Sequence, residues 1–275
     1  MSERRKVAVT GRAERALHPR AGPETTHAPD SAPPPYSQTL LTPPSTTSIK
    51  TTDFVGEPTK ACLLMVPDIF GIHEFKQSCQ VADRLVAAIP GLAVAHPNVF
   101  KDGEGPWSMS EFPPKDKAKF GAFVAAHPYE HVKGVMQEGF AALEAKAGGG
   151  DKASSLKRLT MGFCWGALMA VEANADAEMR IDGTAGAHPT FFGKEKELAP
   201  KLRAPVLLLP TKEDPVLESG AGGKGAEVRV RRFDDQVHGF MAARGDYKDE
   251  KVREAAGQGV GEVATFISSI VGESA

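Results

Sequence analysis

Five short apolar runs, separated by longer stretches with helical periodicity, constrain the fold of this chain more than any other feature. The runs are ACLLMVP (61–67), LAVAHP (92–97), RLTMG (158–162), GTAGAHP (183–189) and PVLLLP (205–210). Strand-length apolar runs of this kind are typical of the buried central strands of a parallel sheet. Between the runs apolar residues step by three or four, as Val81, Leu85 and Ile89 do, and this spacing indicates amphipathic helices. The alternation predicts an α/β fold, with a mostly parallel, doubly wound sheet covered by helices on both faces.

The other segments predict a single domain preceded by a leader. Residues 1–50 hold eight of the 21 prolines and few large apolar residues, so they predict a disordered leader and leave residues 51–275 as the domain. EVRVRRF at 227–233 alternates apolar and basic residues, which is typical of an edge strand with one wet face. A flexible loop is expected at 145–155, and 248–271 predicts a closing helix weakened by its glycines.

The N-terminal segment and the cysteines indicate in which cellular compartment the protein resides. The first 20 residues are rich in arginine, a bias that organelle transit peptides share. No amphipathic apolar face accompanies these arginines, and this favours a solvated tail that carries no targeting signal. The three cysteines show no C-x-x-C spacing, which argues against a disulfide framework or a zinc site and for a reducing compartment. We therefore expect a cytoplasmic protein, with an organelle as the alternative if the leader is a transit peptide.

Charge and hydropathy limit the kinds of partner. The formal net charge is -2 and no basic stripe is interleaved with aromatic residues, so a nucleic-acid partner is not expected. No stretch approaches the roughly 18 to 20 apolar residues that a membrane span needs, so no membrane partner is expected either. A small-molecule partner remains, with the chain acting as a monomer or a small homo-oligomer.

One motif suggests a nucleophile. TMGFCWG at 160–166 puts Gly162-x-Cys164-x-Gly166 between an apolar strand and a helix-forming run, the context in which such a motif predicts an exposed nucleophile. The glycines are needed because the backbone there is strained and its neighbours approach closely. A helix N-terminus favours thiolate, and the amide of Trp165 can point at a developing oxyanion. The alternative is a buried, inert cysteine in a short chance pattern.

An acid and a histidine follow in order. Asp214 lies just past the carboxyl end of the run at 205–210, and His238 follows the next expected strand; in doubly wound folds functional residues collect at such ends. Nucleophile, acid and histidine in this order match the α/β-hydrolase order. Glu213, Asp234 and Asp235 remain alternatives for the acid. A solvated loop histidine is the alternative for His238.

Residues 60–270 resemble the dienelactone hydrolases (carboxymethylenebutenolidases), which are α/β-hydrolases with a Cys-Asp-His catalytic triad. The matching motifs are DIFG at 68–71, GFCWGA at 162–167, EDPV at 213–216 and HGF at 238–240. The resemblance implies an α/β-hydrolase fold in a single domain. It also implies hydrolysis of a small ester or lactone through a thioester, without a metal or an organic cofactor.

The resemblance also implies roles for individual residues. The implied catalytic residues are Cys164 as nucleophile, Asp214 as orienting acid and His238 as base. Asp68 corresponds to an acid, often Glu in the family, that contacts the resting cysteine. The backbone amides of Ile69 and Trp165 correspond to the oxyanion hole. Ala167 departs from the family pattern, which has a second glycine at this place.

Substrate contacts are the least specified part of the site. Arg244 lies in the loop where the family's bacterial enzymes hold a substrate carboxylate, although its offset from His238 differs. His188 is expected either at the rim of the cleft or as a turn residue, and Trp107 either walls a pocket or packs under a loop. The alternative function, from another class, is a ligand-binding or thiol-sensing module on a hydrolase scaffold.

Overall fold

A seven-stranded sheet organises the chain, in the order β1-β3-β2-β4-β5-β6-β7. The computed structural model describes residues 52–72, 76–100, 107–218 and 226–272, so the expected leader lies outside the described residues. The strands are β1 (Thr52–Gly56), β2 (Ala61–Val66), β3 (Leu92–Pro97), β4 (Lys157–Phe163), β5 (Gly183–Ala187), β6 (Val206–Leu209) and β7 (Val228–Val230). All neighbouring strands are parallel except β1, which runs antiparallel to β3. The expected mostly parallel sheet is confirmed.

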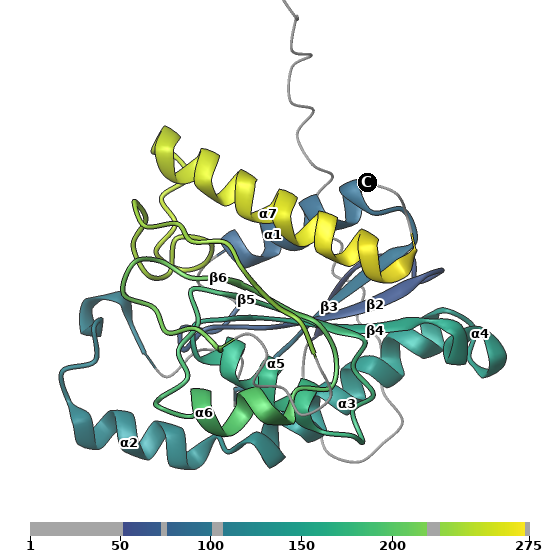
Figure 1. Ribbon diagram of the computed structural model, residues 1–275, viewed down its shortest axis with the longest axis horizontal. Helices are drawn as coiled ribbons and strands as arrows, with labels where there is room; N and C mark the ends of the chain where they lie inside the picture. The colour runs from purple at the N-terminus through teal and green to yellow at the C-terminus, as the bar shows by residue number, and fades with distance from the viewer. Residues whose placement is uncertain (1–51, 73–75, 101–106, 219–225, 273–275) are drawn as a thin grey trace, which may run out of the picture. The chain divides into compact units, whose positions relative to one another are not determined.

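Helices cover both faces of this sheet. The helices are α1 (Gln77–Ala88), α2 (Lys117–Ala126), α3 (Tyr129–Lys146), α4 (Gly150–Ser155), α5 (Trp165–Ala175), α6 (Glu195–Leu198) and α7 (Glu250–Val271), with short 3₁₀ helices η2 (Met109–Glu111) and η3 (Ala199–Lys201). α1 and α7 lie on one face, and α3, α5 and α6 lie on the other (Figure 1). The expected doubly wound arrangement is therefore observed. None of the helices in the described ranges has both the length and the apolar composition to cross a bilayer.

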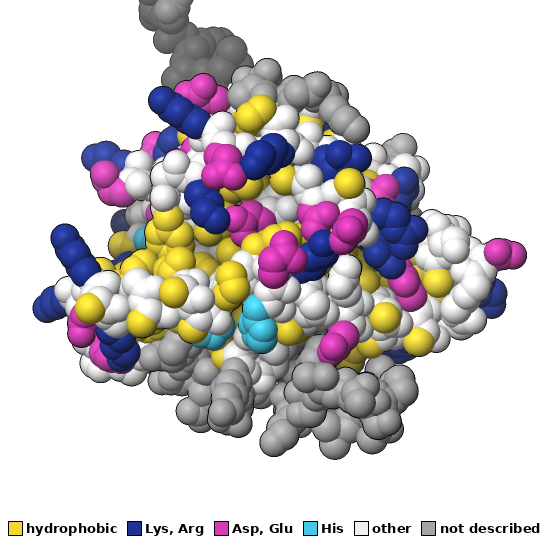
Figure 2. Space-filling view, turned by 90° about the horizontal axis from the view of Figure 1, so that it is seen from below, with side chains coloured by type: hydrophobic (Ala, Val, Ile, Leu, Met, Phe, Trp, Pro, Cys, Tyr) yellow, Lys and Arg dark blue, Asp and Glu magenta, His cyan; other side chains and the backbone are white. Residues whose placement is uncertain are grey.

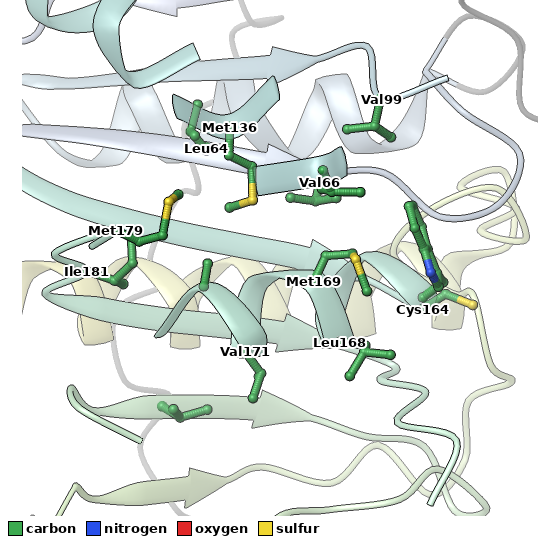
Figure 3. Packing of buried hydrophobic residues seen from close by; sticks show 14 of the residues in the cluster. Leu64, Val66, Val99, Met136, Cys164, Leu168, Met169, Val171, Met179 and Ile181 are labelled. Atoms are coloured by element: carbon green, nitrogen blue, oxygen red, sulfur yellow. The ribbon is translucent and has the colours of Figure 1, made fainter. Parts of the chain in front are cut away.

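The central strands are buried because both of their faces are covered. Every residue of β2, β3, β5 and β6 is buried, as the continuous apolar runs predict. Burying one Leu or Val side chain contributes roughly 1.5 to 3 kcal/mol. Figure 3 shows the layer between β2 and α5, in which Val66 packs near Met169; Cys164 lies at one end of this cluster, and its sulfur points away from the other labelled side chains. The nucleophile candidate thus lies where the core meets the edge of the sheet.

Several elements differ from the sequence expectations. β1 was not expected, because its five residues follow the proline-rich leader without a long apolar run. β7 has three residues rather than the seven expected at 227–233, and Val230 at its end is 43% exposed. The expected loop at 145–155 contains α4, because three glycines at 148–150 with positive φ end α3 and turn the chain into a new helix.

α2 is a second helix that the periodicity did not indicate. Its apolar residues are spread around the helix, so no single face marks it as amphipathic. Asp116 caps it by accepting hydrogen bonds from the amides of Ala118 and Lys119. Phe123 is the one buried residue of α2, and the centroid of its ring lies 5.3 Å from the centroid of the Trp165 ring. Figure 2 views the molecule from below, and it shows apolar side chains gathered at the end where α2 lies.

Candidate active site

Cys164 occupies a strained turn between β4 and α5. Its backbone has φ 54° and ψ −118°, a conformation that costs a non-glycine residue about 1 to 3 kcal/mol. Neighbouring segments hold this backbone in place. The Cys164 amide donates to the Ala187 carbonyl at 3.1 Å, and the Cys164 carbonyl accepts from the Thr190 amide at 3.2 Å. The end of β5 and the segment after it therefore maintain the strain.

The two glycines of the motif allow this turn to pack. A Cβ on Gly162 would lie 2.1 Å from the carbonyl oxygen of Gly166. A Cβ on Gly166 would lie 2.4 Å from the carbonyl oxygens of both Val66 and Pro67. Both obstacles are backbone atoms, which cannot move aside as a flexible side chain does. Glycine at 166 is thus what lets the turn lie directly against the end of β2.

The thiol of Cys164 lies at the N-terminus of α5. Cys164 is the N-cap residue of this helix and is 8% exposed, so its sulfur lies at the positively polarised end of α5. The Thr190 hydroxyl lies 3.8 Å from the sulfur. Sequence reasoning did not identify Thr190, since nothing in its local pattern marks it as a neighbour of Cys164.

His238 and Asp214 form a close pair. His238 Nδ1 and Asp214 Oδ1 are 2.6 Å apart. The other carboxylate oxygen of Asp214 accepts from the amide and the hydroxyl of Thr211, at 2.8 and 2.7 Å. Of the acids left open by the sequence, Asp214 is thus the one that contacts His238. Thr211 was missed, although a hydroxyl residue three positions before an acid is a recognisable turn signal.

The pKa values of His238 and Asp214 are shifted in opposite directions. Burial lowers the pKa of His238, but its interactions with Asp214 and Cys164 outweigh burial and raise that pKa to about 10. Burial raises the pKa of Asp214, while the hydrogen bonds and charge from His238 and the bonds from Thr211 bring it below its usual value. At neutral pH the histidine is therefore an imidazolium flanked by a carboxylate. Such a group can donate a proton to a departing oxygen.

Two backbone amides near the turn are available as donors. Trp165 is the first residue of α5, and Ile69 follows the end of β2, against which the turn packs. Within the described parts of the chain, neither amide donates to a protein acceptor. Both residues are almost fully buried, and an unpaired buried N–H group is costly unless a ligand or water accepts from it. The two amides can therefore bind an oxyanion.

Asp68 makes different contacts from those that the family resemblance implied. Its Oδ1 accepts from the Phe70 amide at 3.0 Å, and its Oδ2 accepts from the Ala243 amide at 3.3 Å. Burial raises the pKa of Asp68 to about 6, although these two amides and His238 act in the opposite direction. Both hydrogen bonds come from the backbone and not from the thiol. Asp68 thus ties the segment after β2 to the loop after His238.

His188 lies beneath the site and not at its rim. The side chain is fully buried, with φ 38°, and its ring centroid is 5.1 Å from that of His238. Neither ring nitrogen has a hydrogen-bond partner among the described residues. Burial and the charge of His238 lower the pKa of His188 well below its usual value, so the ring is neutral. Of the two alternatives for His188, the rim of the cleft is contradicted, because β5 ends at Ala187 and directs the His188 side chain into the core.

The other two expected substrate residues have different surroundings. Arg244 Nη1 donates to the His238 carbonyl at 2.9 Å, and its guanidinium lies 4.9 Å from the centroid of the Phe112 ring. Arg244 is therefore beside the loop that carries His238. Trp107 is 4% exposed and packs against Phe120, with the Lys119 ammonium over its ring. Trp107 is thus buried in aromatic packing, as one of its two alternatives predicted, but it packs against helix α2 and not under a loop.

The described residues form no metal-binding cluster, and a cavity on their surface lies apart from the candidate site. Within the described ranges, no group of three or more His, Cys, Asp or Glu side chains is arranged to hold a metal ion. A cavity of about 290 Å³ lies at the amino end of β4, and Lys157, Arg158 and Asp182 are among the residues that line it. Cys164 follows the opposite end of the same strand, so this cavity is not part of the candidate site.

Comparison with known sequences gives a family match. The family model described as "Dienelactone hydrolase family" matches residues 52–270. An uncharacterised AIM2 family protein of Schizosaccharomyces pombe is 31% identical over 119 residues, which cover 41% of this chain and 46% of that protein. The matching part thus spans less than half the length of this curated relative.

Comparison with solved structures shows the same fold at low sequence identity. A dienelactone hydrolase-like promiscuous phosphotriesterase from metagenomic libraries has a TM-score of 0.56 at 15% identity, covering 80% of this chain and 92% of its own. Esterase PE8 has a TM-score of 0.52 at 15% identity, covering 79% and 97%. A soluble variant of monoglyceride lipase from Saccharomyces cerevisiae has a TM-score of 0.50 at 9% identity, covering 86% and 97%. These likenesses identify the α/β-hydrolase fold.

Proposed function

The chain belongs to the dienelactone hydrolase family, and on that premise we propose that it hydrolyses a small ester or lactone through a Cys164-His238-Asp214 triad. The observation that carries the proposal is the 2.6 Å contact between His238 and Asp214, and Cys164 as well as Asp214 raises the pKa of His238. Thiolate, imidazolium and carboxylate in this order are the arrangement that nucleophilic acyl transfer needs.

In the first half-reaction the thiolate of Cys164 attacks the carbonyl carbon of the substrate. The carbonyl π electrons move to oxygen, and the oxyanion accepts hydrogen bonds from the amides of Ile69 and Trp165. Collapse of the tetrahedral intermediate reforms the carbonyl and breaks the carbon–oxygen bond of the ester. The departing alkoxide takes the proton of the His238 imidazolium, which leaves a thioester on Cys164 and a neutral histidine.

In the second half-reaction water resolves the thioester. Neutral His238 removes a proton from water as the water oxygen attacks the thioester carbonyl. The second tetrahedral intermediate expels the Cys164 thiolate and releases the carboxylic acid, so the thiolate–imidazolium pair is restored. Asp214 keeps Nδ1 of His238 in place and stabilises the imidazolium in both half-reactions.

We infer the class of substrate from the family and from the positively charged side chain of Arg244. We expect the substrate to carry an anionic group near Arg244, whose guanidinium is held between the His238 carbonyl and the Phe112 ring. Among the described carboxylates, none pairs with Arg244, so its remaining N–H groups are open to a ligand. A small carboxylated lactone or ester fits these groups.

The proposal is tested with a panel of dienelactones and activated esters. Cys164→Ala is expected to abolish hydrolysis, by at least about 10³-fold, while the melting temperature stays near that of the wild type. Cys62→Ala is the matched control, because burial raises the pKa of the Cys62 thiol to about 12 and makes it inert. Full activity of the Cys164→Ala protein would refute the triad.

Stoichiometric labelling separates the enzyme from a binding or thiol-sensing module. Iodoacetamide is expected to alkylate Cys164 rapidly and at that site alone, and labelling is expected to stop hydrolysis in proportion. Fast labelling of Cys164 in a protein that turns over no member of the ester panel would instead support the binding alternative and contradict the proposed hydrolase.

A further inference from the structure

The ring of Phe112 stacks on the imidazole of His238. The two ring centroids are 6.1 Å apart, and the ring planes are inclined by only 10°. Phe112 follows η2 in the connection between β3 and α2, which contributes no member of the triad. The ring is half-buried and also contacts Phe70, at 5.9 Å between centroids. A segment without a catalytic residue thus places an aromatic face on the catalytic histidine.

Arg244 links this ring to the backbone of His238. Its Nη1 donates to the His238 carbonyl, and its guanidinium lies over the Phe112 ring. The stem of Arg244 packs on Gly239, where an added Cβ would lie 3.0 to 3.2 Å from the Arg244 side chain. Gly239 has φ 94°, so only glycine adopts this turn without strain. The loop from His238 to Arg244 therefore contacts the Phe112 ring through the side chains at both of its ends.

The hydrogen bond to Asp214 does not by itself fix the plane of the imidazole. A single contact at Nδ1 leaves the ring free to tilt about that bond, and the last torsion of a histidine side chain has broad minima. The parallel ring of Phe112 opposes this tilt. The ring of His188, inclined by 67° to His238, makes a second contact from the interior.

We propose that Phe112 is a positioning residue that holds the imidazole plane of His238 so that its second nitrogen faces the thiol of Cys164. The inference rests on the proposed triad and adds a residue from a separate segment to it. Because a misplacement of about 1 Å in a catalytic group costs on the order of 100-fold in rate, a loosened imidazole slows both half-reactions. The Arg244 guanidinium, which lies over the same ring, is also held by its hydrogen bond to the His238 carbonyl and by packing on Gly239, so loss of the ring is expected to change KM less than kcat.

The test compares a flat with a flexible side chain at position 112. Phe112→Leu keeps an apolar side chain but removes the ring, and Phe112→Tyr keeps the ring. Phe112→Leu is expected to lower kcat about 10-fold with KM changed less than about twofold, and Phe112→Tyr is expected to stay within about twofold of the wild type. Phe192→Leu is the matched control, because Phe192 is 42% exposed and its ring contacts Phe120.

A second readout does not require turnover. The alkylation rate of Cys164 at neutral pH reports the thiolate–imidazolium pair, and it is expected to fall about 10-fold in Phe112→Leu and to recover in Phe112→Tyr. A wild type that hydrolyses nothing on the panel would contradict the proposed function, whereas the alkylation rates would still test the positioning role. If Phe112→Leu lowers the melting temperature markedly, Phe112→Met serves in its place.

Three results would overturn the inference. Wild-type kcat and wild-type alkylation in both Phe112→Leu and Phe112→Met would show that the ring restrains nothing. A change confined to KM, with kcat and alkylation intact, would make Phe112 a wall of the substrate site instead. An equal loss in Phe112→Tyr and Phe112→Leu would also contradict stacking, because the tyrosine ring preserves it.

Discussion

The two ends of strand β4 differ in how their polar groups are satisfied. At the amino end, Lys157 pairs with Asp182 at 3.1 Å and Arg158 pairs with Glu144 at 2.5 Å. The Arg158 guanidinium also lies 5.0 Å from the centroid of the Phe140 ring. Here Lys157 and Arg158 each meet an opposite charge from another segment, and no residue of β4 itself has a positive φ.

At the carboxyl end the groups are held in less favourable states. Cys164 and His188, which follow adjacent strands, both have positive φ. The nitrogens of His188 lack partners among the described residues, and burial raises the pKa of Asp68 to about 6. Strain and unpaired polar groups of this kind persist only where the surrounding structure enforces them, and they are concentrated at functional sites. The paired charges of the amino end thus contrast with the strained and unpaired groups of the carboxyl end, where we propose that the substrate reacts.

The largest expected effect is on the charge pair of the carboxyl end. Asp214→Asn removes the carboxylate that stabilises the imidazolium, so kcat is expected to fall by about 10³-fold, equivalent to about 4 kcal/mol. Asp234→Asn, an exposed acid after β7, is the control and should leave kcat within about twofold. Steady-state kinetics on an ester that the wild type hydrolyses would decide this, and equal effects of the two variants would remove Asp214 from the site.

The next effect is on the packing of the strained turn. Gly166→Ala puts a Cβ 2.4 Å from two backbone carbonyl oxygens, and it is expected to destabilise the protein by about 3 kcal/mol. Gly134→Ala is the control, because a Cβ there meets nothing within 4 Å on the exposed face of α3, and it should stabilise by roughly 0.5 to 1 kcal/mol. Urea unfolding measures both, and a neutral Gly166→Ala would show that the turn is loosely packed.

The pH dependence of stability is a smaller effect with a defined sign. The pKa of His238 is raised in the folded state from 6.5 to about 10. Protonated His238 therefore contributes stability that is fully present below pH 6.5 and is lost as the pH rises through about 10. The wild type should exceed His238→Gln in unfolding free energy by about 2 kcal/mol at the acidic side of this window and lose that advantage at its alkaline side. A constant difference between the two proteins would contradict the imidazolium.

The smallest effect is expected at the amino end. Arg158→Met removes the pair with Glu144 but keeps an apolar stem beside Phe140, so stability should fall by about 1 kcal/mol. Activity should stay within about twofold, because this end contacts no residue of the proposed triad. Parallel urea unfolding and ester assays would check both. A tenfold loss of activity, on the order of 1.4 kcal/mol, would show that the two ends of β4 are coupled.

The sequence predicted the sheet and the order of the triad candidates more completely than their surroundings. The apolar runs predicted β2 to β6 because strands buried on both faces need apolar residues at every position. Among the elements that escaped this reasoning, β1 has no such run, α2 has no apolar face, and α4 lies in a segment expected to be a loop. Among the site residues, Cys164 and His238 could be found because each follows a strand in a recognisable motif.

The missed and corrected residues share one cause. Thr190 and Phe112 reach the site across the fold, from positions whose local sequence gives no sign of a contact. His188 was expected at a rim or in a turn, but the direction of its side chain depends on where β5 ends. Asp68 was assigned to the thiol, and its partner Ala243 is 175 residues away in the chain. Contacts over such separations are not encoded in local spacing.

The sequence by itself determined the α/β architecture, the strand–turn–helix at Cys164 and the order in which acid and histidine follow. These properties depend on apolar periodicity and on glycine, which act locally. Only the tertiary structure decided that Asp214 is the acid in contact with His238, that His188 is neutral and buried, and that Phe112 stacks on the imidazole. The physical reason is that hydrogen bonds, burial and ring contacts require segments far apart in the chain to meet, and that meeting is fixed only when the whole sheet has packed.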